Sequence, residues 1–100
     1  MKLSVLERII LLQVLPTEGT YITFQILISL KKSLSFTEKE IKEFGISEKE
    51  GRVTWGKTED KEIEIGEKAT EIIVGSFKKL DKDGKINEQN INLYEKFIKT

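Results

Sequence analysis

GRVTWGKTEDKEIEIG, residues 51–66, is the stretch that decides the fold, because it is the best candidate for a β-ribbon in a chain otherwise patterned for helices. Residues 53–55 are β-prone, and polar and apolar residues alternate over residues 61–65, as in a half-buried strand. We predict that these two runs pair, with Trp55 opposite Ile63. Their shared apolar face is then formed by Val53, Trp55, Ile63 and Ile65. Helices on both sides of the ribbon in the sequence must cover that face.

The apolar run from Val5 to Leu15 predicts the first helix, which begins at the capping box formed by Ser4 and Glu7. The run is too short to span a bilayer, contains charged residues and does not resemble a signal peptide. A helix that is apolar on nearly every side is buried on most sides. We therefore expect this helix either at the centre of the core, wrapped by the other four, or partly in a homodimer interface.

Two more helices are predicted before the ribbon. Residues 20–34 fit a strand by their alternation and a helix by their three- and four-residue spacing. Their length and the lysines near their end favour the helix. Thr37 and Glu40 form a second capping box, and Gly45 supplies the left-handed residue that ends a short helix over residues 38–44.

A polar loop over residues 47–50 is expected to lead into the ribbon, and two helices follow it. Gly66 is the expected N-cap of the fourth helix, which ends at Gly84, and Asn87 is the expected cap of the fifth. The predicted buried side of the fifth helix consists of Ile91, Leu93, Tyr94, Phe97 and Ile98. The chain as a whole predicts one domain over residues 1–100 with a mostly helical α+β fold. This fold has five helices and a two-stranded ribbon between the third and fourth, in an order similar to that of a winged helix.

Composition excludes several classes of function. The chain has no cysteine and no histidine, which removes thiolate nucleophiles, disulfides, histidine-dependent catalytic triads and most zinc sites. Seventeen basic and seventeen acidic side chains cancel, so no net field draws the protein to nucleic acid or to a membrane. We expect a cytoplasmic protein that is not an enzyme and needs no cofactor or metal.

Residues 80–87, LDKDGKIN, are similar to the middle of a calcium-binding EF-hand loop. Aligning Gly84 with the loop glycine places Asp81 and Asp83 at ligand positions. Lys79 then falls at the first ligand position and Asn90 at the twelfth, where a bidentate glutamate is needed. We interpret the segment as a turn between two helices, with weak calcium binding over residues 81–90 as the alternative.

The outer face and the loop of the ribbon are the candidate binding surface. Residues 36–66 carry nine acidic and six basic side chains, so nucleic acid phosphates would be repelled there. DNA binding would instead depend on a basic patch assembled by folding from Arg8, Lys31, Lys32, Lys78 and Lys79. The candidate partner-binding residues are Arg52, Thr54, Lys57, Glu59, Asp60, Glu62 and Glu64.

Five segments, LERIILLQVLPTEG, LSFTEKE, GRVTW, EIEIGEKATEIIV and LYEKFI, resemble short uncharacterised proteins encoded by phages and prophages of Gram-positive bacteria. The resemblance covers almost the whole chain and carries no motif that assigns an activity or a site. It implies a small accessory protein that binds a host or phage protein, for example to inhibit a defence system or redirect transcription.

Three hypotheses of function follow. The first is stoichiometric binding and modulation of a protein partner through the ribbon, its acidic tip and the helix over residues 38–44. The second is a winged-helix DNA-binding regulator, whose affinity would fall steeply with salt. The third is an oligomeric protein that sequesters a small anionic ligand between subunits.

Overall fold

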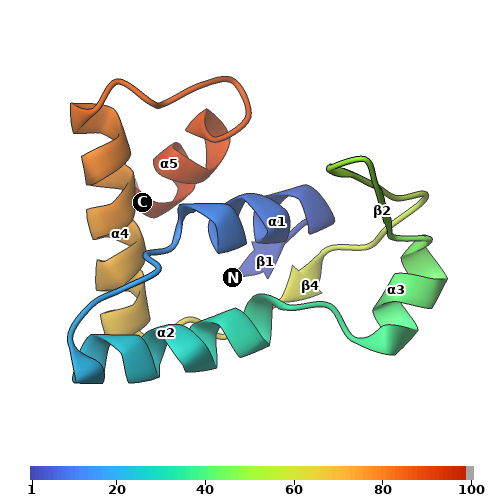
Figure 1. Ribbon diagram of the computed structural model, residues 1–100, viewed down its shortest axis with the longest axis horizontal. Coiled ribbons are helices and arrows are strands. Elements are labelled where there is room, and N and C mark those ends of the chain that lie inside the picture. The colour runs from blue at the N-terminus through green and yellow to red at the C-terminus, as the bar shows by residue number, and fades with distance from the viewer. Residues whose placement is uncertain (99–100) are drawn as a thin grey trace.

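The structure, a computed structural model, describes residues 1–98. Within them the chain forms five α-helices and two small antiparallel sheets (Figure 1). The elements are β1 (Lys2–Leu3), α1 (Val5–Val14), α2 (Tyr21–Leu34), α3 (Glu38–Phe44), β2 (Ser47–Lys49), β3 (Arg52–Thr54), β4 (Lys61–Glu62), α4 (Glu67–Lys82) and α5 (Ile91–Ile98). The predicted mostly helical α+β fold, with a two-stranded ribbon between α3 and α4, is confirmed.

Local signals in the sequence set the helix ends. The side chains of Ser4 and Thr37 each accept a hydrogen bond from the backbone three residues on, and Glu7 and Glu40 return the bond, so both capping boxes form. Gly45 adopts the left-handed conformation, with φ of 62°, at the end of α3. The predicted helix boundaries for α1 and α3 are thus confirmed, because capping depends only on residues close in sequence.

The later helices also follow their predictions, with one exception. Residues 21–34 are helical, which resolves the choice between helix and strand. Gly66 is the N-cap of α4, and the Asn87 side chain caps the turn that leads into α5 by accepting from the backbone of Asn90. Ile91 was expected on the buried side of α5, but its side chain is exposed. It occupies the first position of α5, before the helix reaches the core.

The core lies between α1, α2, α4 and α5. In Figure 1, α1 lies in the middle, with α2 along the lower edge and α4 along one side. Helix α1 packs against both α2 and α4, and α5 packs against α4. The central position expected for the first helix is thus the one observed, although α3 lies apart from it. Leu6 is the one large apolar residue of α1 classed as exposed, at 45%, so little of this helix is left for a second copy of the chain.

The pairing of the strands differs from the prediction. The run around Trp55 and the run around Ile63 do not pair with each other: β3 pairs with β2, and β4 pairs with β1. The expected polar loop over residues 47–50 therefore contains a strand. A two-residue turn joins β2 to β3 at Glu50 and Gly51, whose φ angles are 54° and 78°. Closing a two-residue turn costs less chain entropy than closing the longer loop that we predicted. Pairing of β2 with β3 is therefore favoured over pairing of β3 with β4.

The predicted apolar face of the ribbon is accordingly split. Ile63 is buried in the core and Ile65 packs against it. Val53 is exposed and Trp55 half-buried on the separate β2–β3 hairpin, outside the core cluster. Trp55 and Val53 therefore do not join the core as the sequence suggested.

Candidate interaction arm

Residues 36–60 form an arm that projects from the helical body. The arm consists of α3, the β2–β3 hairpin and the loop that follows, and it lies at the right of Figure 1. Among the described residues, the core cluster contains no member of this segment, and α3 has no buried residue. All residues of β2 and β3 are exposed. A quarter of the chain thus folds without contributing to the hydrophobic core.

The hairpin presents one polar face. Its register places Ser47 opposite Thr54 and Lys49 opposite Arg52, and side chains at alternate positions of a strand share a face. The hydroxyl groups of Ser47 and Thr54 are 3.1 Å apart and share a hydrogen bond. Two hydroxyls and two cations therefore lie together on one side of the hairpin. Glu48 and Val53 lie on the opposite side.

The hairpin is fixed to α3 through the backbone. The N–H of Gly56 donates to the carbonyl oxygen of Phe44 at 2.7 Å, and the N–H of Ile46 donates to the carbonyl oxygen of Ile41 at 3.0 Å. These two bonds tie both ends of the hairpin to the last turn of α3. The arm is therefore one unit and not two independent projections.

A polar clamp made of Arg8, Phe36, Glu40 and Lys61 holds the base of the arm against the body. The Arg8 side chain on α1 is fully buried. Its Nη1 and Nη2 donate to the two carboxylate oxygens of Glu40, at 2.6 and 3.3 Å. Its Nε and Nη2 also donate to the carbonyl oxygens of Leu34 and Ser35, where α2 ends. One arginine thus joins α1, the end of α2 and the start of the arm.

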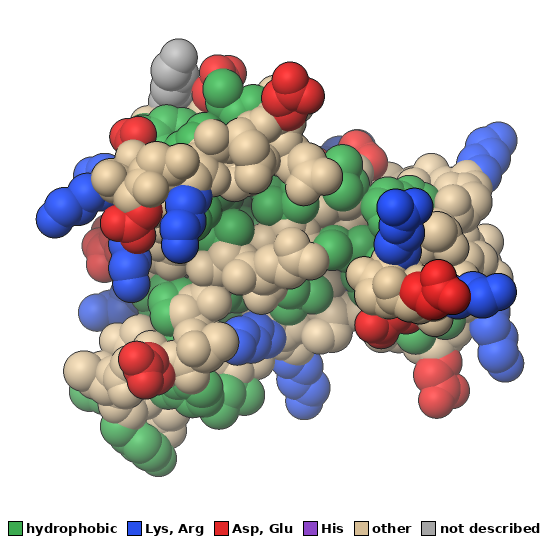
Figure 2. All heavy atoms as spheres, turned by 45° about the horizontal axis from the view of Figure 1, so that its top comes forward, with side chains coloured by type: hydrophobic (Ala, Val, Ile, Leu, Met, Phe, Trp, Pro, Cys, Tyr) green, Lys and Arg blue, Asp and Glu red, His purple; other side chains and the backbone are tan. Residues whose placement is uncertain are grey.

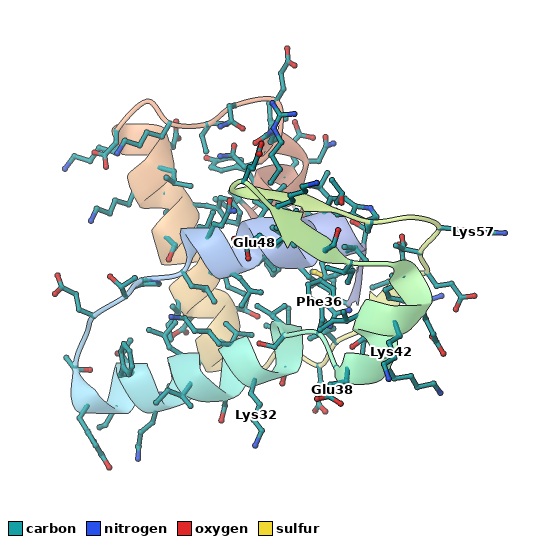
Figure 3. The ribbon with its side chains drawn as sticks, turned by 45° about the vertical axis from the view of Figure 1, so that its right-hand side comes forward. Lys32, Phe36, Glu38, Lys42, Glu48 and Lys57 are labelled. Atoms are coloured by element: carbon teal, nitrogen blue, oxygen red, sulfur yellow. The ribbon has the colours of Figure 1, made fainter. Side chains whose placement is uncertain are left out.

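Phe36 and Lys61 complete the clamp, since Phe36 contacts Arg8 and Lys61 contacts Glu40. The Phe36 ring lies against the guanidinium, 4.0 Å from its carbon to the ring centroid, which is a cation–π contact. Figure 3 shows Phe36 directed inward while Lys57 points away from the body. Lys61 Nζ donates to Glu40 Oε1 at 3.4 Å. Among the described residues, no buried side-chain polar atom lacks a hydrogen-bond partner.

The same contacts set the charge of Glu40. The hydrogen bonds from Arg8, opposed by burial and helped by the bond from the Thr37 backbone and the nearby Arg8 and Lys61 charges, lower the pKa of the Glu40 carboxyl from 4.5 to about 2. Glu40 is therefore ionised at all pH values near neutrality, and the clamp is a permanent ion pair there.

The structure brings together five of the seven predicted partner-binding residues. Arg52 and Thr54 lie on β3, and Lys57, Glu59 and Asp60 lie in the loop after it. All five are exposed.

The other two predicted residues lie elsewhere. Glu62, on β4, accepts a hydrogen bond from the Met1 amino group at 2.8 Å, which lowers the pKa of its carboxyl. Glu64 lines a groove beside α2. Their assignment to the outer face of one ribbon with Arg52 and Thr54 was wrong, because β4 pairs with β1 and not with β3.

Sequence reasoning missed Ser47 and Lys49 as members of the candidate surface. They were assigned to a loop because a strand with no buried face has no apolar alternation to reveal it. The one available signal was the pair Glu50–Gly51, an acidic residue followed by glycine, which lies between Lys49 and Arg52 and fits a two-residue hairpin turn.

The charge of the arm is mixed. Residues 36–60 contain seven acidic and five basic side chains, and buried Arg8 neutralises one of the acids. Figure 2 shows the arm as the lobe at the right, with both colours of charge on it. Arg8 is buried, so it cannot belong to the basic surface patch that DNA binding would require.

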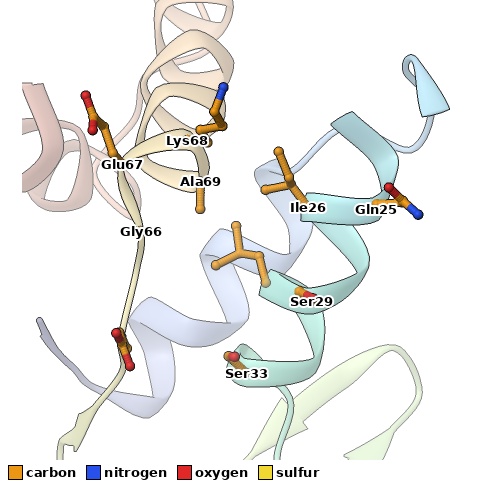
Figure 4. A pocket seen from close by; sticks show the side chains of 10 residues that line it. Gln25, Ile26, Ser29, Ser33, Gly66, Glu67, Lys68 and Ala69 are labelled. Carbon is orange, nitrogen blue, oxygen red and sulfur yellow. The ribbon is translucent and has the colours of Figure 1, made fainter. Parts of the chain in front are cut away.

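A groove of about 580 Å³ lies between α2 and the start of α4 (Figure 4). Ile26 and Ala69 point toward one another across it. Its charged lining residues are two acids, Glu64 and Glu67, and one base, Lys68. This excess of negative charge does not suit binding of a small anion within this groove.

Two candidate ligands in the turn over residues 81–90 make hydrogen bonds within the chain. The Asn90 oxygen accepts from the backbone of Asn87, and the Tyr94 hydroxyl donates to Asp81. Within residues 1–98 there is no group of three or more acidic side chains placed to hold a metal ion. The same residues contain no helix of the length and apolar character needed to cross a bilayer.

A scan against protein-family models, a search of the curated proteins and a search of the solved structures each found no match for this chain.

Proposed function

We propose that this protein binds a protein partner stoichiometrically through the arm and thereby modulates it. One observation carries the proposal: residues 36–60 stay outside the core, yet a fully buried arginine holds their base in place. A segment that adds no apolar burial to the core does little for the stability of the body. Its ordered, exposed surface is then available for binding, at a small loss of conformational entropy.

The binding surface consists of the polar hairpin face and the loop after it. Ser47, Lys49, Arg52 and Thr54 provide hydroxyl groups and cations on one side of the hairpin. Lys57, Glu59 and Asp60 add charges of both signs in the loop. Charges of both signs favour a folded protein with a complementary polar surface over a uniformly anionic polymer. The resemblance to phage and prophage proteins implies a host or phage protein, met in the cytoplasm, as the partner.

The test compares tagged variants in the native host. Lys49→Glu combined with Arg52→Glu, or replacement of residues 57–60 by a neutral glycine-serine linker, should abolish capture of the partner and leave the melting temperature unchanged. Lys78→Glu combined with Lys79→Glu reverses the same number of charges on α4, outside the arm, and should leave capture intact. The partner, identified by mass spectrometry and purified, should bind in a fixed ratio by titration calorimetry. Full binding by both arm variants would refute the proposal.

A second candidate is the winged-helix DNA-binding regulator, which is favoured by the order of α2, α3 and hairpin alone. This function requires a shift of duplex DNA at low salt that disappears as salt is raised. Reversing Lys49 and Arg52 would weaken binding to DNA as well as to a protein partner, so the salt-dependent shift of duplex DNA, and not the arm variants, separates the two functions. No shift at low salt would dispose of the DNA-binding candidate.

A further inference from the structure

The geometry points to a second interaction surface, on the outer face of α2, whose occupant is α2 of a second copy of this chain in an antiparallel twofold arrangement. This surface lies outside the arm and does not depend on the function proposed for it. It also differs from the first helix, where the sequence suggested a dimer, because Leu6 is the one large apolar side chain of α1 that is exposed.

The three most exposed large apolar side chains of the described residues all lie on α2. Tyr21 is 78% exposed, Ile22 69% and Ile28 57%. Positions 21, 25 and 28 follow one stripe of the helix, and position 22 lies beside it on the side of Ser29. Figure 1 shows α2 along the lower edge of the molecule, and Figure 2 shows hydrophobic side chains gathered at the lower left, where α2 begins. The face is open over its length.

The area is suited to an interface between two copies. The three side chains expose on the order of 350 Å² together, which is the size of the largest apolar patch on a typical monomer. Two copies would remove roughly 700 Å² through these residues alone, more than half of the ~1,200 Å² at the lower end of stable interfaces. The interface would also include Gln25, which lies between Ile22 and Ile28, and Ser29 and Ser33, which follow Ile28. The two serines are small and Gln25 is polar, so all three can be accommodated in a contact between helices.

The charges specify the partner and its direction. Residues 19–30 contain no charged side chain, whereas Glu18 precedes them and Lys32 follows closely. Both are exposed, and in the described part of the chain neither has an ion-pair partner. An antiparallel second copy brings the connection that carries Glu18 near the helix end that carries Lys32 of the other chain, while a parallel copy places like charges together. Lys32 is directed away from the body, where such a partner would lie (Figure 3).

The register is set with Gln25 of both chains on the twofold axis. Ile22 of one chain then lies level with Ile28 of the other, and Glu18, in the extended connection before α2, lies near the end of the partner helix that carries Lys32. The exposed isoleucines then flank the central contact on its two sides, and the two central amides can bond across the axis. A twofold interface of this kind uses the same surface on both chains and closes at a dimer.

Sedimentation equilibrium of the full chain tests the surface. We expect a reversible dimer whose dissociation constant rises about tenfold or more in Ile28→Glu, because that change buries a charge against an apolar surface. Leu6→Glu makes the same substitution at the exposed residue of α1 and should leave the dimer unchanged. A wild-type monomer at all concentrations overturns the inference, and so does a dimer that Leu6→Glu dissociates and Ile28→Glu does not. Circular dichroism of both variants verifies that they are folded.

Two further measurements test the direction. Lys32→Glu and Glu18→Lys should each weaken the dimer, and the double variant should restore it, since the pair is then reversed. Because the chain has no cysteine, Gln25→Cys should crosslink under mild oxidation, whereas Ser33→Cys, about 24 Å from its twofold mate, should not. Crosslinking of Ser33→Cys in preference to Gln25→Cys would overturn the antiparallel register.

Discussion

Removing Glu40 tests whether the clamp secures the arm. The Glu40→Ala variant leaves the guanidinium of Arg8, which is fully buried, without a counter-charge. Breaking one side of a buried ion pair costs about 3–5 kcal/mol. Glu40 itself is 13% exposed and Lys61 also contacts it, so we expect the lower end of that range, about 3 kcal/mol. For a domain of this size the melting temperature should fall by about 12–24 °C.

The assay is urea denaturation followed by circular dichroism, applied to a double-mutant cycle. Arg8→Met combined with Glu40→Ala should be more stable than Glu40→Ala alone, because an apolar side chain of similar length can occupy the site without a buried charge. Glu43→Ala is the matched control on the same helix. Glu43 is exposed and 3.8 Å from Lys39, so its loss should change the free energy of unfolding by at most about 0.5 kcal/mol.

The pH dependence gives the same clamp a second, independent signature. The folded-state pKa of Glu40 is below its ordinary value, so its contribution to stability is complete above pH 4.5 and is lost as pH falls toward 2. The fall in pKa corresponds to at most about 3–4 kcal/mol, and screening by water at the exposed edge leaves roughly 2 kcal/mol. Glu40→Gln should remove this part of the acid dependence. A loss below about 1 kcal/mol in Glu40→Ala, additive effects in the cycle, or an unchanged acid profile would refute the reasoning.

Three further predictions concern other parts of the chain. Glu50 has a positive φ of 54°, so Glu50→Asn should stabilise the hairpin by about 0.5 kcal/mol, detected as a higher melting temperature; a lower value would contradict the turn geometry. Phe77 is fully buried between the rings of Tyr94 and Phe97, so Phe77→Ala should cost about 3–5 kcal/mol in urea denaturation, and a cost under 1 kcal/mol would place it outside the core. Millimolar calcium should leave the melting temperature unchanged, because Asn90 uses its oxygen to cap the turn; a calcium-dependent rise would show that the loop binds the ion.

The helices could be predicted from the sequence because their signals are local. Ser4 with Glu7 and Thr37 with Glu40 mark the helix starts within four residues, and Gly45 marks an end. The strand pairing could not be predicted, because two polar strands joined by a two-residue turn leave no apolar pattern. The apolar alternation of residues 61–65 was real, but it reflected packing of Ile63 and Ile65 against helices and not a partner strand at Trp55.

The clamp was missed for a different reason. Its partners are 32 residues apart, and a capping box already explained Glu40. Yet Arg8 interrupts an apolar run that was predicted to be buried, and a buried cation requires a counter-charge. That requirement could have prompted a search among the acids of neighbouring elements, although nothing in the sequence selects Glu40 over the others.

The position of Trp55 has a practical consequence. It is the one tryptophan of the chain, and it lies in the arm, whereas most helical residues lie in the body. Intrinsic fluorescence therefore reports on the arm while the far-ultraviolet helical signal reports on the body, without any label. If the two signals change at the same denaturant concentration, Arg8 makes the arm and the body one cooperative unit. If fluorescence changes first, the arm opens as a separate unit, and the free energy between the two midpoints measures how firmly it is held.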